Sequence, residues 1–245
     1  MTDTDTLKQQ AAEKALEYVS SGMVIGLGSG TTSMIMVKRL AEMIRTGVLQ
    51  SITGVPTSTA TEKEARQGGI PLVSPDDCRS VDLTIDGADE VDPHRNLIKG
   101  GGGALLREKI VAQASRRLII IVDQSKLSPV LGTRWPLPVE VVPVCWRNQA
   151  AFIESLGGVP KLRFDHQGRP FTTDQGNYIL DCGFGPMNHP EEIASRLDGR
   201  AGIVEHGLFL NMADTIISAG PDGIRLLEGP DSGQAAAVGN GEVGS

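Results

Sequence analysis

The chain has 245 residues, 40% hydrophobic and 22% charged, as expected for a globular protein of one large or two modest domains. Its net charge of −7 argues against electrostatic binding to nucleic acid, and no apolar run is long enough to cross a membrane. The three cysteines and four histidines lack disulfide or metal-site spacing, and the N-terminus is polar and acidic. We therefore expect a cytoplasmic protein with reduced thiols, no secretory signal and no metal.

Helix-like and strand-like segments alternate through the first half of the chain. Apolar periodicity predicts helices at residues 7–20, 31–45, 58–67 and 104–116. Short apolar runs predict strands at residues 23–28, 51–55, 70–73, 81–86 and 117–123. This alternation with short links predicts an α/β fold with a doubly wound, mostly parallel, Rossmann-like sheet.

The pattern changes near residue 130. The remaining elements are a β-like stretch at 135–143, helices at 146–156 and 189–199, and two strands within 171–182 around a hairpin turn at 174–177. We infer an inserted, smaller α+β domain over 132–207. Residues 1–131 plus 208–228 would form the Rossmann-like catalytic domain, since the chain returns to finish the first sheet. The tail at 229–245 lacks bulky apolar residues apart from isolated valines, and we expect it to be disordered.

A glycine-rich turn, GLGSGTTS (26–33), lies between a predicted strand and helix. Its glycines allow close backbone approach, and the helix N-terminus offers free N–H groups beside the hydroxyls of Ser29, Thr31 and Thr32. This arrangement suits a phosphate or a polyol, although an ordinary capped turn would share the pattern. A dinucleotide fingerprint would need glycine at Thr31 and a later acidic residue, and no Walker A loop occurs.

Two further motifs carry candidate groups, and the first of them follows a predicted strand. DGADEVD (86–92) sets carboxylates where ligands of open sheets bind, which suits sugar hydroxyls or proton transfer better than a metal. KGGGGALLREK (99–109) has four consecutive glycines whose N–H groups could surround an oxygen that becomes negative. Glu108, early in the next helix, could be a general base. The alternatives are a solvated acidic loop and a flexible linker.

Lysines provide the charge that an anionic ligand needs in an acidic protein. Lys126, after another strand, Lys99 and Lys8 are candidates, although lone lysines are more often merely exposed. Because these segments follow parallel strands, we expect them to converge on one crevice.

The chain resembles type A ribose-5-phosphate isomerase over residues 7–227, in the stretches GLGSGTTS, TIDGADEVD, IKGGGGALLREKI, VDQSKL, PLPVEVVP and GLFLNMADTIISAGPDGI. The order and spacing of DGADE and KGGGGALLREK are highly specific. SGTT stands where the family more usually has a TGST-like run, and leucine precedes Arg107 where threonine is common. Neither departure touches a charged catalytic position.

The resemblance implies a metal-independent, cofactor-free enzyme of the pentose phosphate pathway that interconverts ribose 5-phosphate and ribulose 5-phosphate. Glu108 would carry the proton between C2 and C1 through an enediolate, Asp86 and Lys99 would assist ring opening and proton movement, and Asp89 would help hold the site. The expected substrate-binding residues are Ser29, Gly30, Thr31, Thr32, Gly87, Ala88, Gly100, Gly101, Gly102, Lys126 and Lys8. The family also implies a ferredoxin-like smaller domain and a cytosolic homo-oligomer, often a dimer.

Competing hypotheses are a non-catalytic sugar-phosphate sensor, an amino-sugar phosphate deaminase or lactonase, and a nucleotide-dependent oxidoreductase. A sensor would need neither Glu108 nor Lys99, the KGGGGALLREK segment argues against the related enzymes, and the failed fingerprint argues against the last.

Overall fold

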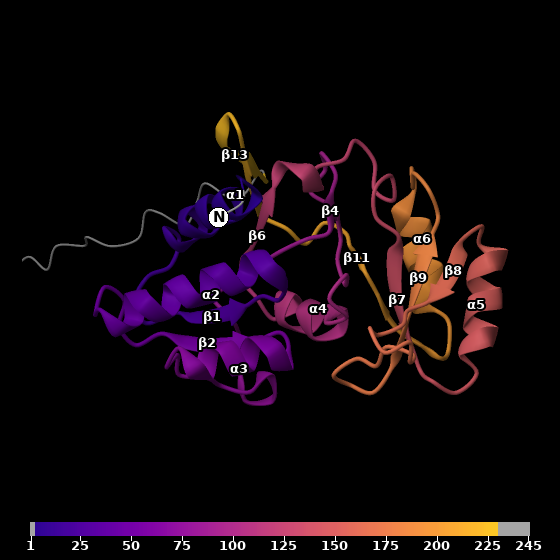
Figure 1. Ribbon diagram of the computed structural model, residues 1–245, viewed down its shortest axis with the longest axis horizontal. Helices are drawn as coiled ribbons and strands as arrows, with labels where there is room; N and C mark the ends of the chain where they lie inside the picture. The colour runs from indigo at the N-terminus through magenta and orange to yellow at the C-terminus, as the bar shows by residue number, and fades with distance from the viewer. Residues whose placement is uncertain (1–2, 230–245) are drawn as a thin grey trace, which may run out of the picture.

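The computed structural model describes residues 3–229 and consists of an α/β unit and an α+β unit side by side (Figure 1). The first unit has a six-stranded sheet in the order β13-β12-β6-β3-β1-β2, parallel except for β13. Its strands are β1 (Val24–Leu27), β2 (Thr53–Pro56), β3 (Leu83–Asp86), β6 (Leu118–Asp123), β12 (Thr215–Gly220) and β13 (Gly223–Glu228). Its helices are α1 (Asp3–Leu16), α2 (Gly30–Arg45), α3 (Thr59–Gln67) and α4 (Leu105–Gln113). The predicted doubly wound sheet is confirmed.

The central strand β6 is buried on both faces, which explains its unbroken apolar sequence. Ile119 and Ile121 pack into the core beneath α1 and α2. Leu118, Ile120 and Val122 face the opposite core, which includes a residue of α4. Helices therefore cover both faces, as a parallel sheet requires.

The strand order places a topological switch point between β1 and β3. From β1 the chain passes to β2 on one side, whereas β3, β6 and β12 follow on the other. The loops beyond β1 and β3 therefore diverge, and the crevice between them is where sheets of this kind bind ligands. The GLGSGTTS and DGADEVD motifs begin at these two strand ends.

The second unit is an antiparallel sheet in the order β10-β7-β9-β8. Its elements are β7 (Leu137–Val141), α5 (Trp146–Ser155), β8 (Val159–Leu162), β9 (Tyr178–Gly183), α6 (Pro190–Asp198) and β10 (Ile203–His206). This βαββαβ succession is the ferredoxin-like arrangement expected. It lies within the predicted insertion, whose boundaries at 132 and 207 remain a prediction.

A small third sheet, β11-β5-β4, lies between the two larger ones (Figure 1). It comprises β4 (Glu90–Val91), β5 (Leu97–Ile98) and β11 (Leu208–Phe209), and the sequence analysis predicted none of them. Leu208 and Phe209 pair with β5, so only the later part of 208–228 joins the main sheet. Two 3₁₀ turns, η1 (Pro75–Asp77) and η2 (Gln124–Lys126), complete the elements.

The predicted strand at 70–73 is wrong. It contributes one bridge, Leu72 to Gly54, flanked by hydrogen bonds to the carbonyl of Pro71 and from the N–H of Val73. Pro71 has no N–H to continue a ladder. The helix predicted at 7–20 begins at Asp3 and ends at Leu16, because the next N–H groups bond to carbonyls three residues back.

The predicted hairpin within 171–182 is half wrong. The turn exists, since the N–H of Thr173 donates to Asn177 O, but the segment before it makes only a bridge from Thr172 to Tyr178. The strand β9 pairs instead with β7 and β8. The predicted disordered tail, apart from Gly229, lies outside the described residues.

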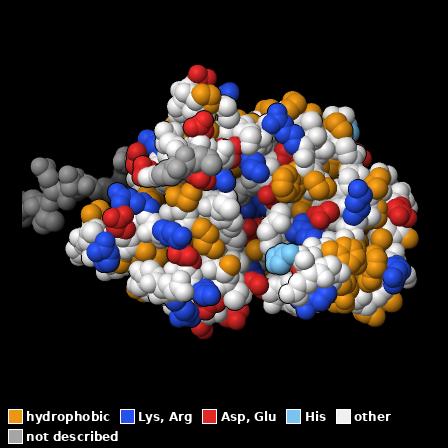
Figure 2. Space-filling view, in the orientation of Figure 1, with side chains coloured by type: hydrophobic (Ala, Val, Ile, Leu, Met, Phe, Trp, Pro, Cys, Tyr) orange, Lys and Arg blue, Asp and Glu red, His pale blue; other side chains and the backbone are white. Residues whose placement is uncertain are grey.

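The visible surface is mixed in charge. Figure 2 shows Lys, Arg, Asp and Glu interspersed over this face, with apolar side chains gathered over the antiparallel unit. Within residues 3–229 no helix has both the length and the apolar character needed to span a bilayer.

Candidate active site

A cavity of about 130 Å³ lies beyond the carboxyl ends of β1 and β3. Every residue that lines it was predicted from the sequence as a site residue: Lys8, Ser29, Gly30, Thr31, Thr32, Gly87, Ala88, Asp89, Lys99, Gly100, Gly101, Gly102, Glu108 and Lys126. The remaining predicted residue, Asp86, does not line the cavity but contacts Lys99. The structure thus brings all the strand-end motifs together.

Asp86 is fixed by its neighbours. It ends β3 with 1% of its surface exposed, and its Oδ1 accepts hydrogen bonds from Ser29 N at 2.9 Å, Gly87 N at 2.7 Å and Ser33 Oγ at 3.3 Å. Gly28 allows this approach, because a Cβ there would lie 2.3 Å from Oδ1. The other oxygen, Oδ2, is left for Lys99.

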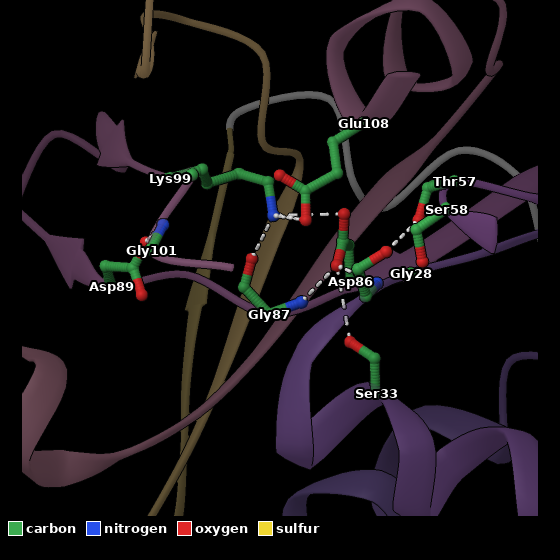
Figure 3. Close-up of polar contacts among 12 residues, drawn as sticks. Gly28, Ser33, Thr57, Ser58, Asp86, Gly87, Asp89, Lys99, Gly101 and Glu108 are labelled. Carbon is green, nitrogen blue, oxygen red and sulfur yellow. Dashed lines mark hydrogen bonds and ion pairs between the residues drawn. The ribbon is translucent and has the colours of Figure 1, made fainter. Parts of the chain in front are cut away.

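Lys99 joins the polar groups of the site (Figure 3). Its Nζ lies 3.0 Å from Asp86 Oδ2 and 3.4 Å from Glu108 Oε1, and it donates to Gly87 O at 2.5 Å. The side chain is buried and reaches in from the segment after β5. A single ammonium therefore links carboxylates from β3 and α4.

Lys99 remains protonated. Burial alone would lower the pKa of its ammonium, but the carboxylates of Asp86 and Glu108 outweigh burial and raise this pKa above its usual value. The Phe209 ring, centred 5.5 Å from Nζ, adds a favourable contact for the cation.

Glu108 lies in the first turn of α4 and is 5% exposed. Its Oε1 faces Lys99, whereas its Oε2 is buried without a hydrogen-bond partner. Burial raises the pKa of Glu108 to about 8; Lys99 opposes this rise, and Asp86 and Asp89 add to it. A carboxyl group with such a pKa can accept and return a proton near neutral pH.

The glycine segment differs from expectation in where its N–H groups point. Gly101 N donates to Asp89 Oδ2 at 2.7 Å, and Gly103 N donates to Gly100 O at 2.9 Å. These two N–H groups therefore hold the loop itself and are not directed at an oxyanion. Lys99 is then the principal positive group beside Glu108.

The far end of the cavity is suited to an anion. The helix α2 begins there at Gly30, and Ser29 makes no side-chain cap, so the first N–H groups and the positive end of the helix dipole remain available. Lys8 Nζ donates to Thr31 Oγ1 at 3.0 Å, and Lys126 lines the same cavity from η2. Two lysines and a helix N-terminus together can bind a phosphate.

A hydroxyl network behind this loop was missed by the sequence analysis. Ser29 Oγ lies 2.7 Å from Thr57 Oγ1 and 3.2 Å from Thr61 Oγ1, while Thr61 Oγ1 donates to Gly28 O at 3.0 Å. The run of hydroxyl residues in VPTSTAT, which begins in the last two residues of β2, was the available signal. Ser33 was also missed, although it ends the predicted motif.

The site's carboxylates are engaged by Lys99 and by backbone N–H groups, which suits them to proton transfer more than to metal binding. Among the described residues, one group has metal-ligand spacing and lies outside the cavity: Asp198, Glu205 and His206. Lys109 forms an ion pair of 2.6 Å with Glu205 of this group.

Comparison with known proteins agrees with this geometry. The sequence model of the family "Ribose 5-phosphate isomerase A (phosphoriboisomerase A)" matches residues 53–223. Ribose-5-phosphate isomerase A of Chloroflexus aurantiacus is 54% identical over 235 residues, covering 96% of this chain and 98% of the relative, and that of Desulfatibacillum aliphaticivorans is 55% identical, covering 93% and 99%.

Solved structures agree as well. Ribose 5-phosphate isomerase from Plasmodium falciparum has a TM-score of 0.89 at 38% identity, covering 92% of this chain and 99% of that one. A D-ribose-5-phosphate isomerase in complex with phospho-erythronic acid has a TM-score of 0.90 at 35% identity, covering 93% and 100%.

Proposed function

The chain belongs to the ribose 5-phosphate isomerase A family, and from this premise we propose how its residues perform the reaction. The protein is an aldose–ketose isomerase that interconverts ribose 5-phosphate and ribulose 5-phosphate. The reaction moves one proton between C2 and C1 and a second between the two oxygens, so it needs a base that also returns a proton and a cation near the oxygens.

The buried, unpartnered Oε2 of Glu108 carries the assignment of the base. Glu108 lines the cavity, and its raised pKa suits both removal and return of a proton. We assign it the transfer from C2 to C1 through an enediolate. One carboxylate can serve both carbons because C1 and C2 are adjacent.

Lys99 and Asp86 are assigned to the oxygens of the substrate. The Lys99 ammonium would stabilise the negative charge that develops on O1 and O2, which typically contributes about 10²–10³-fold in rate. Asp86, held at 3.0 Å from Lys99, would assist ring opening. Asp89, joined to Gly101, would help to hold the substrate and this wall of the cavity.

The phosphate is assigned to the first turn of α2, with Lys8 and Lys126. Anchoring the distant end of the substrate provides binding energy that orients C1 and C2 against Glu108. Ser29, Thr31 and Thr32 provide hydroxyl groups on the same wall.

Isomerisation in D₂O tests the mechanism. Purified protein in excess EDTA is given ribose 5-phosphate, and the products are followed by NMR. We expect ketose formation with deuterium at the exchanging carbon. Binding without turnover would support the sensor hypothesis, and turnover that EDTA abolishes would contradict metal-independent chemistry.

The variant Glu108→Gln tests the base. The amide keeps the size of the side chain but cannot accept the proton, so we expect kcat to fall by about 10²–10⁴-fold with little change in substrate binding. The control is Glu154→Gln, in α5 of the antiparallel unit. More than about a tenth of wild-type turnover in Glu108→Gln would exclude Glu108 as the base.

We also propose a homodimer, as the family resemblance implies. The strand β13 forms an edge of the main sheet, and its Ile224 and Leu226 are exposed, which offers apolar surface for a second copy. Sedimentation equilibrium should give twice the chain mass of 26.0 kDa. A mass of one chain across micromolar concentrations would contradict the dimer.

A cytoplasmic location and a place in the pentose phosphate pathway complete the proposal. All three cysteines are unpaired and Cys145 is exposed, as a reducing compartment allows. The substrate is a phosphorylated sugar, which fits the same compartment.

A further inference from the structure

We propose that Arg163 is a positioning residue that fixes the glycine wall of the active site from the antiparallel unit. The proposal rests on the function assigned to segment 99–109 above. Arg163 follows β8 directly and lines a different cavity. It belongs to none of the sequence motifs, so neither the sequence nor the active-site cavity marked it as part of the site.

The guanidinium of Arg163 binds the Asp181 carboxylate along one edge and two backbone carbonyls along another. Its Nε and Nη2 donate to the carboxylate of Asp181 on β9, with Nε 2.9 Å from Oδ2. Its Nη1 donates to Gly100 O and to Gly101 O, each at 3.0 Å. Because the guanidinium is rigid and planar, orientation by Asp181 also aims Nη1 at the two carbonyls.

One peptide unit is held from both ends by these contacts. The carbonyl of Gly100 accepts from Arg163, and the N–H of Gly101 in the same planar unit donates to Asp89 Oδ2 at 2.7 Å. Arg163 therefore sets the plane on which the contact with Asp89 depends. Consecutive glycines have the largest backbone freedom to lose, so this segment gains most from an external clamp.

The burial of Arg163 separates it from an ordinary surface ion pair. Its side chain is 14% exposed, and the ring of Phe171, centred 5.6 Å from the guanidinium carbon, also fills the space beside Gly103. The nearby pair Arg169–Asp165 involves an arginine that is 70% exposed and makes its side-chain hydrogen bonds within its own loop. Arg169 is therefore a matched control.

The principal test compares Arg163→Lys with Arg169→Lys. Lysine keeps the charge and can pair with Asp181, but it has no fork to hold two carbonyls at the same time. We expect kcat of Arg163→Lys to fall by about 10–100-fold, because a misplaced wall misaligns the reacting end. KM for ribose 5-phosphate and the Kd of inorganic phosphate should change by less than about threefold, since the lysines and α2 that bind phosphate are untouched. Arg169→Lys should match the wild type.

Two further readouts distinguish positioning from stability. Binding of phospho-erythronic acid, which carries a carboxylate at the end opposite its phosphate, should weaken in Arg163→Lys by the same factor as kcat. Hydrogen exchange across residues 99–105 should accelerate in Arg163→Lys and remain unchanged in Arg169→Lys. Asp181→Asn, which weakens the support of the fork, should shift both readouts in the same direction by less.

Several outcomes would overturn the proposal. The first is a kcat of Arg163→Lys within twofold of the wild-type value, and the second is unchanged hydrogen exchange at residues 99–105. The third is a loss of kcat equal to the loss of phosphate-binding sites per chain, because a fraction of unfolded protein would then explain the lower kcat. Failure of the proposed function would appear separately, as wild-type protein that does not convert ribose 5-phosphate. Hydrogen exchange would still test the clamp in that case.

Discussion

At the scale of single residues, the site combines a stable ammonium with a carboxyl group that is easily protonated. Lys99 is surrounded by carboxylates and stays charged. Glu108 is buried with one oxygen unpartnered, so its ionised form is disfavoured. This contrast is what the roles proposed above require, with Lys99 as electrostatic stabiliser and Glu108 as base in the same pH range.

The raised pKa of Glu108 predicts the pH dependence of the reaction. Glu108 must be ionised to act as the proposed base, and burial raises its pKa to about 8, so its ionised fraction falls as pH decreases through that value. We expect kcat/KM to rise about tenfold per pH unit up to about pH 8 and then level off. The measurement is kcat/KM from pH 5.5 to 9.5.

The phosphate group of the substrate also ionises, and its effect on kcat/KM falls at a different pH from that of Glu108. Ionisation of a phosphate monoester gives a limb near pH 6, whereas Glu108 should give one near pH 8. Values of kcat/KM that are flat from pH 6.5 to 9 would contradict the assignment of this pKa to the base.

At the scale of elements, the ends of β1 and β3 must approach closely for the site to form. Gly28, directly after β1, leaves room for Asp86 at the end of β3, and Ser29 N then donates to the Asp86 carboxylate. The side-chain size at residue 28 therefore controls the orientation of Asp86, and through it that of Lys99.

Gly28→Ala tests this dependence. The added Cβ would lie 2.3 Å from Asp86 Oδ1 and 2.5 Å from Asp86 Cα, so the strand ends must separate. We expect a loss of about 1–3 kcal/mol in the free energy of unfolding and at least about 10²-fold in kcat/KM. Denaturant titration and steady-state kinetics measure the two effects.

Gly199→Ala is the matched control for this variant. It lies at the end of α6, where the nearest atom to an added Cβ is Ser195 O at 3.6 Å. Equal turnover in Gly28→Ala and the control would show that the spacing of β1 and β3 is not critical.

At the scale of the whole molecule, the antiparallel unit contacts α3 and α4 of the first unit. Besides Arg163, Asp174 Oδ2 accepts a hydrogen bond from Thr59 N, the first N–H of α3, at 2.8 Å and lies 3.7 Å from Arg107. Lys109, in α4, forms its ion pair of 2.6 Å with Glu205 on β10. The residues on either side of Glu108 are thus both tied to the second unit.

Asp174→Ala removes one of these connections. Loss of a carboxylate at a helix N-terminus typically costs about 1 kcal/mol, so we expect a decrease of that size in the free energy of unfolding and a melting temperature lower by about 2–4 °C. Denaturant titration and thermal unfolding measure it. Asp222→Ala, in the exposed turn between β12 and β13, is the control and should change stability by less than about 0.5 kcal/mol. Identical stability of the two variants would contradict a cross-unit role for Asp174.

The sequence by itself determined the doubly wound sheet, a second α+β unit and the motifs that line the cavity, and the family resemblance added the ferredoxin-like arrangement. It could do so because each strand-end motif is contiguous, and because parallel strands must bring their carboxyl ends to one edge. Glu108 became the candidate base because its sequence position predicts an early turn of the helix after the glycines, and the structure places it in the first turn of α4. These features depend on neighbours in the chain.

Tertiary structure alone decided the features that depend on distant partners. The strands β4, β5 and β11 are two residues long, which is too short to give a sequence pattern. The strand β8 contains Pro160, which is compatible with an edge strand but argues against a strand when only the sequence is considered. Arg163 contacts Gly100 from the antiparallel unit, Asp174 contacts Thr59 from the same unit, and no local pattern encodes those contacts. The raised pKa of Glu108 belongs to the same class, because its burial and the charges of Lys99, Asp86 and Asp89 around it arise only in the folded chain.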